Sequence, residues 1–241
     1  MKYLFIVIIL VAATAQFCTA QYMQLFPWNT GTYDKANSND LLIMGQSDEI
    51  DMDNSEIGGN PFWNEEWKTA LLYTGDYKIL IAKVKLNLYK NNVWYTTPEG
   101  IVMFAKTGQV KAITFFNGND TSSILANFVY LKNDGDKNAR FYQVMNGGKT
   151  ELVKLDKVTV NKGLYDPFTG KTEMNYKKET AYFLYQNGEM PLLKNLGKEA
   201  VFSILKTTAH SAEWLNKNRN KLKSEAEIVH FLNYLNAENS K

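Results

Sequence analysis

The chain has 241 residues, enough for one large domain, and its hydrophobic fraction of 45% is typical of a globular protein rather than a disordered or polytopic membrane protein. It carries 27 basic and 25 acidic residues, and a net charge of +2 gives no electrostatic case for nucleic acid as a partner. With one cysteine and two histidines, most zinc sites, disulfide frameworks and histidine-based catalytic groups cannot be assembled.

Residues 1–20 have the pattern of a secretory signal peptide. Lys2 supplies a positive charge, and residues 4–13 form an apolar run of ten. Ten helical residues span roughly 15 Å, about half the hydrocarbon core of a bilayer, which argues against a permanent membrane helix. We expect cleavage after Ala20 and a secreted or periplasmic protein with no integral membrane segment.

Two alternatives at this cleavage site concern the single cysteine, Cys18. Cleavage after Ala15 would leave Cys18 in the mature protein. Acylation of Cys18, as in bacterial lipoproteins, is disfavoured because Phe17 stands where a small residue is required. Cleavage after Ala20 instead removes the cysteine, and a packed core must then supply the stability.

Charge divides the remaining chain into two parts of opposite sign. Residues 21–66 hold one lysine and nine acidic residues, whereas residues 67–241 hold 25 basic and 16 acidic residues. The first part is also rich in Asn, Ser, Gly and Asp, and its apolar residues do not recur with the period of a helix or a strand. We therefore interpret it as an acidic N-terminal arm. The arm could dock on the basic body of its own chain or of a second copy, which would make a homo-oligomer.

Residues 67–194 alternate apolar and polar side chains with the period of β-strands. Between residues 79 and 89, for example, Leu80, Ala82, Val84 and Leu86 are expected on one face. Further strands are predicted at 93–97, 101–105, 110–116, 123–132, 140–145, 151–155, 157–160, 172–176, 180–186 and 190–193.

Dipeptides that favour tight hairpin turns separate several of these strands, so neighbouring strands should be antiparallel. They are Asn117-Gly118, Asp134-Gly135, Asn146-Gly147 and Asn187-Gly188. No helical crossover interrupts the series, which argues against a parallel α/β sheet. The expected fold is mainly β, an antiparallel meander closed as a barrel or sandwich.

Residues 195–241 change to helical spacing. Apolar residues form short stripes, the last of which runs from Ile228 to Leu235. Ser224 and Glu227 stand three residues apart, as in a capping box at a helix start. We therefore predict a C-terminal helical tail that packs against the sheet or caps its open end.

Several short motifs resemble those of an uncharacterised family of secreted β-rich proteins from Gram-negative bacteria. They are Gly59-Asn60-Pro61-Phe62 followed by Trp67, Tyr142-Gln143-Val144, Tyr182-Phe183 before Asn187-Gly188-Glu189-Met190, and Trp214 to Asn218 followed by Glu225 to Tyr234. The resemblance covers most of the mature chain and implies export, a β-rich body and a helical C-terminus. It brings no catalytic residues to this chain.

Aromatic residues in the first half are the strongest candidates for a ligand site. Trp63, Trp67 and Trp94 could stack on sugars or anchor an interface, because indole combines a broad apolar face with a polar N–H. If residues 62–68 form a helical turn, Trp63 and Trp67 share a face. The competing interpretation is that all three tryptophans belong to the core.

The other candidate sites are incomplete. Residues 48–56 are acidic, but Glu56 and Phe62 stand where a helix–loop–helix calcium site requires Gly and Glu, so we expect no metal. The carboxylates of Glu65 and Glu66 are adjacent and would need a distant partner such as Glu99 or Asp120 for hydrolysis. Neither His210 nor His230 has a visible catalytic partner, and the ring of His230 should face solvent.

These observations favour a secreted non-enzymatic module with a binding or structural role at the cell envelope. Its partner would be a protein or a glycan, and we expect no cofactor and no catalytic residue. The alternatives are a glycan-binding module that uses exposed tryptophans and a hydrolase that uses a carboxylate pair.

Overall fold

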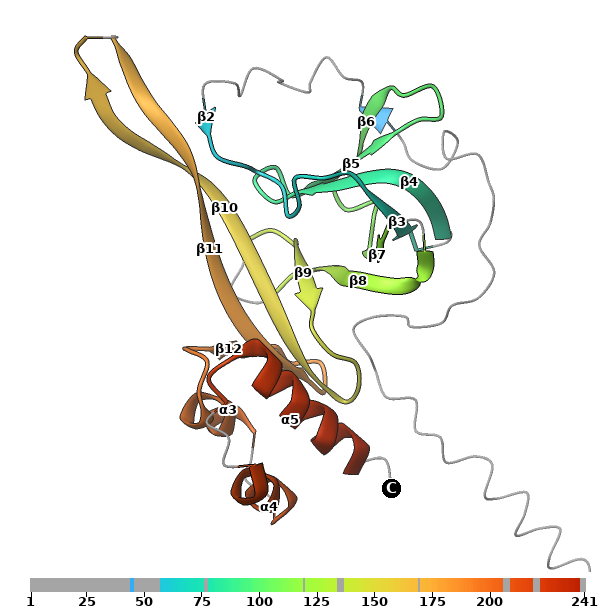
Figure 1. Ribbon diagram of the computed structural model, residues 1–241, viewed down its shortest axis with the longest axis vertical. Coiled ribbons are helices and arrows are strands. Elements are labelled where there is room, and N and C mark those ends of the chain that lie inside the picture. The colour runs from blue at the N-terminus through green and yellow to red at the C-terminus, as the bar shows by residue number, and fades with distance from the viewer. Residues whose placement is uncertain are drawn as a thin grey trace, which may run out of the picture.

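The computed structural model describes residues 44–45, 57–75, 78–118, 120–133, 137–168, 170–205, 209–218 and 222–238. The expected signal peptide and most of the expected acidic arm lie outside these residues. The described part of the chain folds into twelve strands followed by three C-terminal helices (Figure 1). The prediction of a mainly β protein with a helical tail is therefore confirmed.

The described strands join in one sheet, whose neighbours follow the order β1-β6-β5-β4-β3-β7-β8-β9-β10-β11-β12. They are β1 (Met44–Gly45), β2 (Ile57–Gly58), β3 (Lys68–Tyr73), β4 (Lys78–Asn87), β5 (Asn92–Thr96), β6 (Val102–Ala105), β7 (Ala112–Asn117), β8 (Asp120–Leu131), β9 (Arg140–Val144), β10 (Thr150–Asp166), β11 (Lys171–Gln186) and β12 (Leu192–Leu193).

Pairing along this order is antiparallel, as predicted, and only β2 among the described strands pairs in parallel, with β11. The predicted barrel is not confirmed in the described part of the chain, because the two ends of its sheet, β1 and β12, do not pair with each other and the sheet is not closed.

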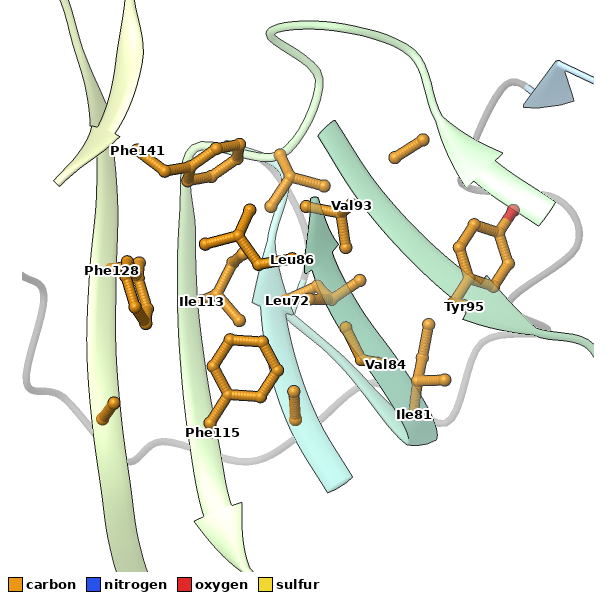
Figure 2. Packing of buried hydrophobic residues seen from close by; sticks show 14 of the residues in the cluster. Leu72, Ile81, Val84, Leu86, Val93, Tyr95, Ile113, Phe115, Phe128 and Phe141 are labelled. Carbon is orange, nitrogen blue, oxygen red and sulfur yellow. The ribbon is translucent and has the colours of Figure 1, made fainter. Parts of the chain in front are cut away.

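Strands β3 to β8 form the body of the protein around one hydrophobic core. Eight successive strands of the sheet order, β6-β5-β4-β3-β7-β8-β9-β10, contribute side chains to this core. In it the rings of Phe115, Phe128 and Phe141 meet aliphatic side chains (Figure 2). Tyr95 and Ile113 are fully buried there. The body thus holds together by close packing of apolar side chains from distant segments.

A β-bulge in β4 changes which side chains reach this core. Two residues of β4, Ala82 and Lys83, lie opposite Thr69 alone, where the register with β3 shifts. Before the bulge Ile81 is buried and Leu80 is exposed, and after it Val84 is buried. The prediction that Leu80 shares a face with Val84 is therefore wrong, because the bulge shifts the alternation by one residue.

Strands β10 and β11 form a long hairpin, which we call the ribbon. It runs continuously from the pair Thr150–Gln186 to the pair Asp166–Lys171, whereas the sequence predicted two shorter strands on each side. Asp156 and Lys178, which lie in the gaps between the predicted strands, make cross-strand contacts instead. The hydroxyl of Thr180 donates to Asp156 at 2.6 Å, and the ammonium of Lys178 lies 3.4 Å from the same carboxylate.

The helical tail comprises α3 (Lys198–Ile204), α4 (Ala209–Asn218) and α5 (Glu225–Glu238). The helices lie at the base of the ribbon (Figure 1). Their apolar side chains pack there on Leu152 and Leu184, so the tail packs against the sheet, the first of the two predicted arrangements. Helix α5 begins with the expected cap, in which Glu227 N–H donates to the hydroxyl of Ser224. The carboxylate of Glu227 accepts from the backbone of Lys223.

Asn236 joins the far end of α5 to the turn between β9 and β10. Its amide nitrogen donates to the carbonyls of Gly147 and Thr150, and its oxygen accepts from Thr150 N–H at 2.9 Å. Asn146 supports the same turn by accepting from Leu152 N–H. These bonds satisfy main-chain groups of the turn and fix the helix against the sheet.

Candidate functional site

The segment that precedes β3 extends the sheet and positions the predicted tryptophans. Trp63 N–H donates to the carbonyl of Leu86 at 2.9 Å, and Leu88 N–H donates to the carbonyl of Pro61 at 2.8 Å. Phe62 lies opposite Asn87 in this antiparallel contact. Because neighbouring residues of an extended segment point to opposite faces, Phe62 and Trp63 are directed to opposite sides of the sheet.

Trp63 is partly buried and packs against the core of the body. Its ring stacks on Phe115, with 4.9 Å between ring centroids, and meets Phe128 edge-on at 5.1 Å. It packs against the buried cluster of the body rather than forming a surface with the other candidates. The helical turn that would have placed Trp63 beside Trp67 is replaced by strand pairing.

The opposite face carries three half-buried aromatic residues around one lysine, which we call the aromatic surface: Phe62, Trp67, Trp94 and Lys85. The Lys85 ammonium lies 4.9 Å from the ring centre of Phe62 and 5.0 Å from that of Trp67. Phe62 meets Trp94 edge-on at 5.2 Å. Lys85 and Trp94 are also cross-strand neighbours on β4 and β5.

Several interactions fix the chemistry of this surface. The indole N–H of Trp94 donates to the side-chain oxygen of Asn92 at 2.9 Å, which sets the orientation of the ring. Partial burial lowers the pKa of Lys85, and the negative charge of Glu65 acts against this. The aromatic faces stabilise the ammonium through cation–π attraction. The surface therefore combines partly exposed aromatic rings with a cation held beside them.

The structure thus brings Trp67 and Trp94 together and separates Trp63 from them. Phe62 and Lys85 were not among the residues predicted for the site. The alternation of β4 did place Lys85 on the outer face, but its aromatic neighbours come from a segment distant in sequence. Only the pairing of that segment with the end of β4 brings them together.

No family model matches the chain, nor does any curated protein or solved structure. The aromatic surface must therefore be interpreted from its own geometry. Every other group of polar residues that the structure describes must likewise be interpreted from its geometry.

The candidate carboxylates lack the buried environment that raises the pKa of a general acid. Glu65, Glu66, Glu99 and Asp120 are all exposed. Hydrogen bonds lower the pKa values of three of these carboxyl groups. The donors are Lys68 for Glu66, Thr97 for Glu99 and Ser122 for Asp120. The general acid of a glycosidase requires a raised pKa, usually through burial, whereas the pKa values of Glu66, Glu99 and Asp120 are lowered.

Histidine and metal chemistry find little support in the described residues. His230 is exposed, as predicted, and its ring lies 5.6 Å from that of Trp214. The side chain of His210 lies outside the described residues. Within the described ranges, no group of three or more His, Cys, Asp or Glu side chains is placed to hold a metal ion.

One polar cluster links the ribbon to the helical tail. The phenol of Tyr182 donates to the carboxylate of Glu225 at 2.6 Å, and the ammonium of Lys154 lies 3.1 Å from the same oxygen. Burial and the bond to Glu225 raise the pKa of Tyr182 to about 12. A phenol with so high a pKa stays protonated at neutral pH and is a poor proton donor, and we interpret the cluster as a structural contact between β11 and α5.

We expect this cluster to make stability depend on alkaline pH. Because the pKa of Tyr182 rises from about 10 in the unfolded chain to about 12 in the fold, the protonated phenol stabilises the fold fully below pH 10. That contribution is lost as the pH rises through 12. The urea midpoint of the wild type should therefore fall toward that of Tyr182→Phe between about pH 9 and pH 12.

The control is Tyr165→Phe, which changes an exposed phenol far from the helical tail. Its midpoint should follow that of the wild type across the same pH range. A difference between the wild type and Tyr182→Phe that stays constant with pH would contradict the expected linkage.

Proposed function

We propose that the protein is an exported, non-enzymatic module that binds a ligand at the cell envelope through the aromatic surface. The proposal of export is supported by the signal-peptide pattern of residues 1–20. The observation that carries the binding role is the grouping of Phe62, Trp67 and Trp94 around Lys85 on the outer face of the sheet.

A glycan is the ligand class that this grouping fits best. The C–H face of a sugar ring can stack on a half-buried indole, which provides apolar contact without a large loss of side-chain entropy. Lys85 adds N–H donors beside the stacking rings, within reach of hydroxyl or carboxylate groups on a bound sugar. A group of partly exposed rings around one cation suits recognition of a sugar chain through stacking on single rings.

Titration of the purified protein with a panel of neutral and acidic oligosaccharides tests this proposal. Binding should shift the tryptophan fluorescence and release heat in calorimetry. We expect Trp67→Ala and Trp94→Ala each to weaken binding by about tenfold or more, equivalent to about 1.4 kcal/mol. Lys85→Met should weaken binding of acidic sugars most strongly.

Lys83→Met is the matched control because Lys83 is an exposed lysine on the same strand. It should bind oligosaccharides as the wild type does. If no oligosaccharide changes the fluorescence or gives heat, or if both tryptophan variants bind with unchanged affinity, the glycan proposal is wrong.

The hydrolase alternative is tested separately with a broad activity screen. The lowered pKa values of Glu66, Glu99 and Asp120 argue against it. Turnover of any substrate that is abolished by a single carboxylate substitution would overturn the non-enzymatic assignment.

A further inference from the structure

The register of β5 and β6 places a further ring beside the aromatic surface. Trp94 of β5 pairs directly with Lys85 of β4 on one side and with Phe104 of β6 on the other. Residues that pair directly across antiparallel strands share a face of the sheet. Phe104 is half-buried, whereas its neighbours Met103 and Ala105 are buried in the core. The ring of Phe104 therefore belongs to the outer face, next to that of Trp94.

Four residues of this face form a row that crosses the strands, which we call the cross-strand row: Trp67, Lys85, Trp94 and Phe104. The Lys85 ammonium joins its first two members, because it lies 5.0 Å from the ring centre of Trp67. Trp67 directly precedes β3, so the row extends from the start of β3 through β4 and β5 to β6. Neighbouring strands lie about 4.8 Å apart, and three such spacings give the row a length of about 14 Å.

The spacing of the cross-strand row fits a linear polysaccharide. Each pyranose ring advances such a chain by a distance close to one strand spacing, and its C–H face can stack on an aromatic ring. A chain that crosses the strands therefore places successive sugars over successive members of the row. The row has room for about three sugars.

The orientations of the rings favour a jointed ligand over a rigid one. Phe62 meets Trp94 at an interplanar angle of 79°, so a flat molecule cannot stack on both rings. The twist of a sheet also rotates each strand by about 20–25° relative to its neighbour. A polysaccharide follows both changes by rotation about its glycosidic linkages. A bound peptide would instead pair with the main chain at a strand edge, because that contact satisfies its backbone groups.

We infer that the ligand is a linear polysaccharide that lies across β3 to β6 along the cross-strand row, with Phe104 as its outermost contact. This ligand specifies the glycan of the proposed function, on which the inference rests. Short oligosaccharides should bind around Lys85, where the rings and the ammonium act together. They do not reach Phe104, so the affinity should depend on the length of the chain.

Calorimetric titration with two series of linear oligosaccharides tests this dependence. β-1,4-linked manno-oligosaccharides and the corresponding oligomannuronates, each from one to six sugars, share a backbone and differ in the carboxylate on each sugar. We expect the affinity for at least one series to rise about tenfold or more from the disaccharide to the tetrasaccharide and then to level off.

Variants of Phe104 assign the gain in affinity to the outermost contact. Phe104→Ala and Phe104→Leu should both remove the gain and leave the affinity for the disaccharide unchanged. Phe104→Leu keeps an apolar side chain and removes only the flat ring, and circular dichroism checks that both variants fold. Val102→Ala is the matched control, because Val102 lies on the same strand and face but pairs with Thr96, outside the row. It should bind every length as the wild type does.

Four results would overturn the inference and leave glycan binding intact. They are equal affinity for the disaccharide and the hexasaccharide, a Phe104→Leu variant that keeps the gain with length, binding of branched or single sugars but of neither linear series, and self-association through Phe104 that sugars displace, seen by light scattering. Failure of every oligosaccharide to bind is a different result, because it contradicts the proposed function itself.

Discussion

Replacing Phe231 by alanine should lower the free energy of unfolding by about 3–5 kcal/mol, the usual cost of removing a fully buried phenylalanine. Phe231 on α5 is completely buried, and its ring meets Phe202 of α3 at 5.6 Å and Trp214 of α4 at 5.0 Å. It therefore joins all three helices in the cluster that covers the base of the ribbon. Its loss leaves a cavity that the surrounding rings can fill only in part.

Urea denaturation followed by circular dichroism measures this loss. The control is Asn233→Ala, an exposed position on the same helix, which should change the free energy of unfolding by less than about 0.5 kcal/mol. Equal midpoints for the two variants would show that α5 does not pack on the ribbon as described. Retention of the sheet with loss of α3 to α5 would show that the tail unfolds as a separate unit.

Features set by short-range chemistry are predictable from this sequence. Asn187 and Gly188 adopt the positive φ values of a tight hairpin turn, 53° and 87°, and the strands on both sides pair as predicted. Ser224 accepts the predicted capping bond. In each case the determining groups lie within a few residues of one another, so the local sequence contains the information that is needed.

The ribbon and the β4 bulge depend on pairing between distant segments. Asp156 and Lys178 fall in gaps between the predicted strands, but each has a partner across the ribbon. The shift at Ala82 and Lys83 likewise depends on their alignment with Thr69. Closure of the sheet into a barrel, which the described residues do not confirm, also depends on distant segments, because the two edge strands would have to meet.

The candidate site was only partly predictable. The sequence alone does not distinguish the roles of Trp63 and Trp67, because both are large aromatic residues and both precede β3. Pairing of Phe62 with Asn87 distinguishes them, since it turns Trp63 toward Phe115 and leaves Phe62 beside Trp94. The sequence could identify the aromatic residues as important but could not assign each one to the core or to the surface.

This distinction leads to the second large effect that we expect. Trp63→Ala should lower the free energy of unfolding by about 3 kcal/mol, because it removes the stacked contact with Phe115 and the edge contact with Phe128. Trp67→Ala should cost no more than about 1 kcal/mol, because its described contact is the cation–π interaction with Lys85. Thermal and urea unfolding of the two variants under the same conditions measure the difference.

Comparing the stability and the ligand binding of the Trp63 and Trp67 variants shows which residue packs on the core and which binds ligand. Trp63→Phe keeps an aromatic ring against Phe115 and should recover much of the stability that Trp63→Ala loses, whereas Trp67→Phe should matter mainly for ligand binding. If Trp63→Ala leaves stability unchanged and Trp67→Ala lowers it strongly, the assignment of the two residues is reversed. A core residue and a binding residue would then have exchanged roles, and the aromatic surface would lie on the other face of the sheet.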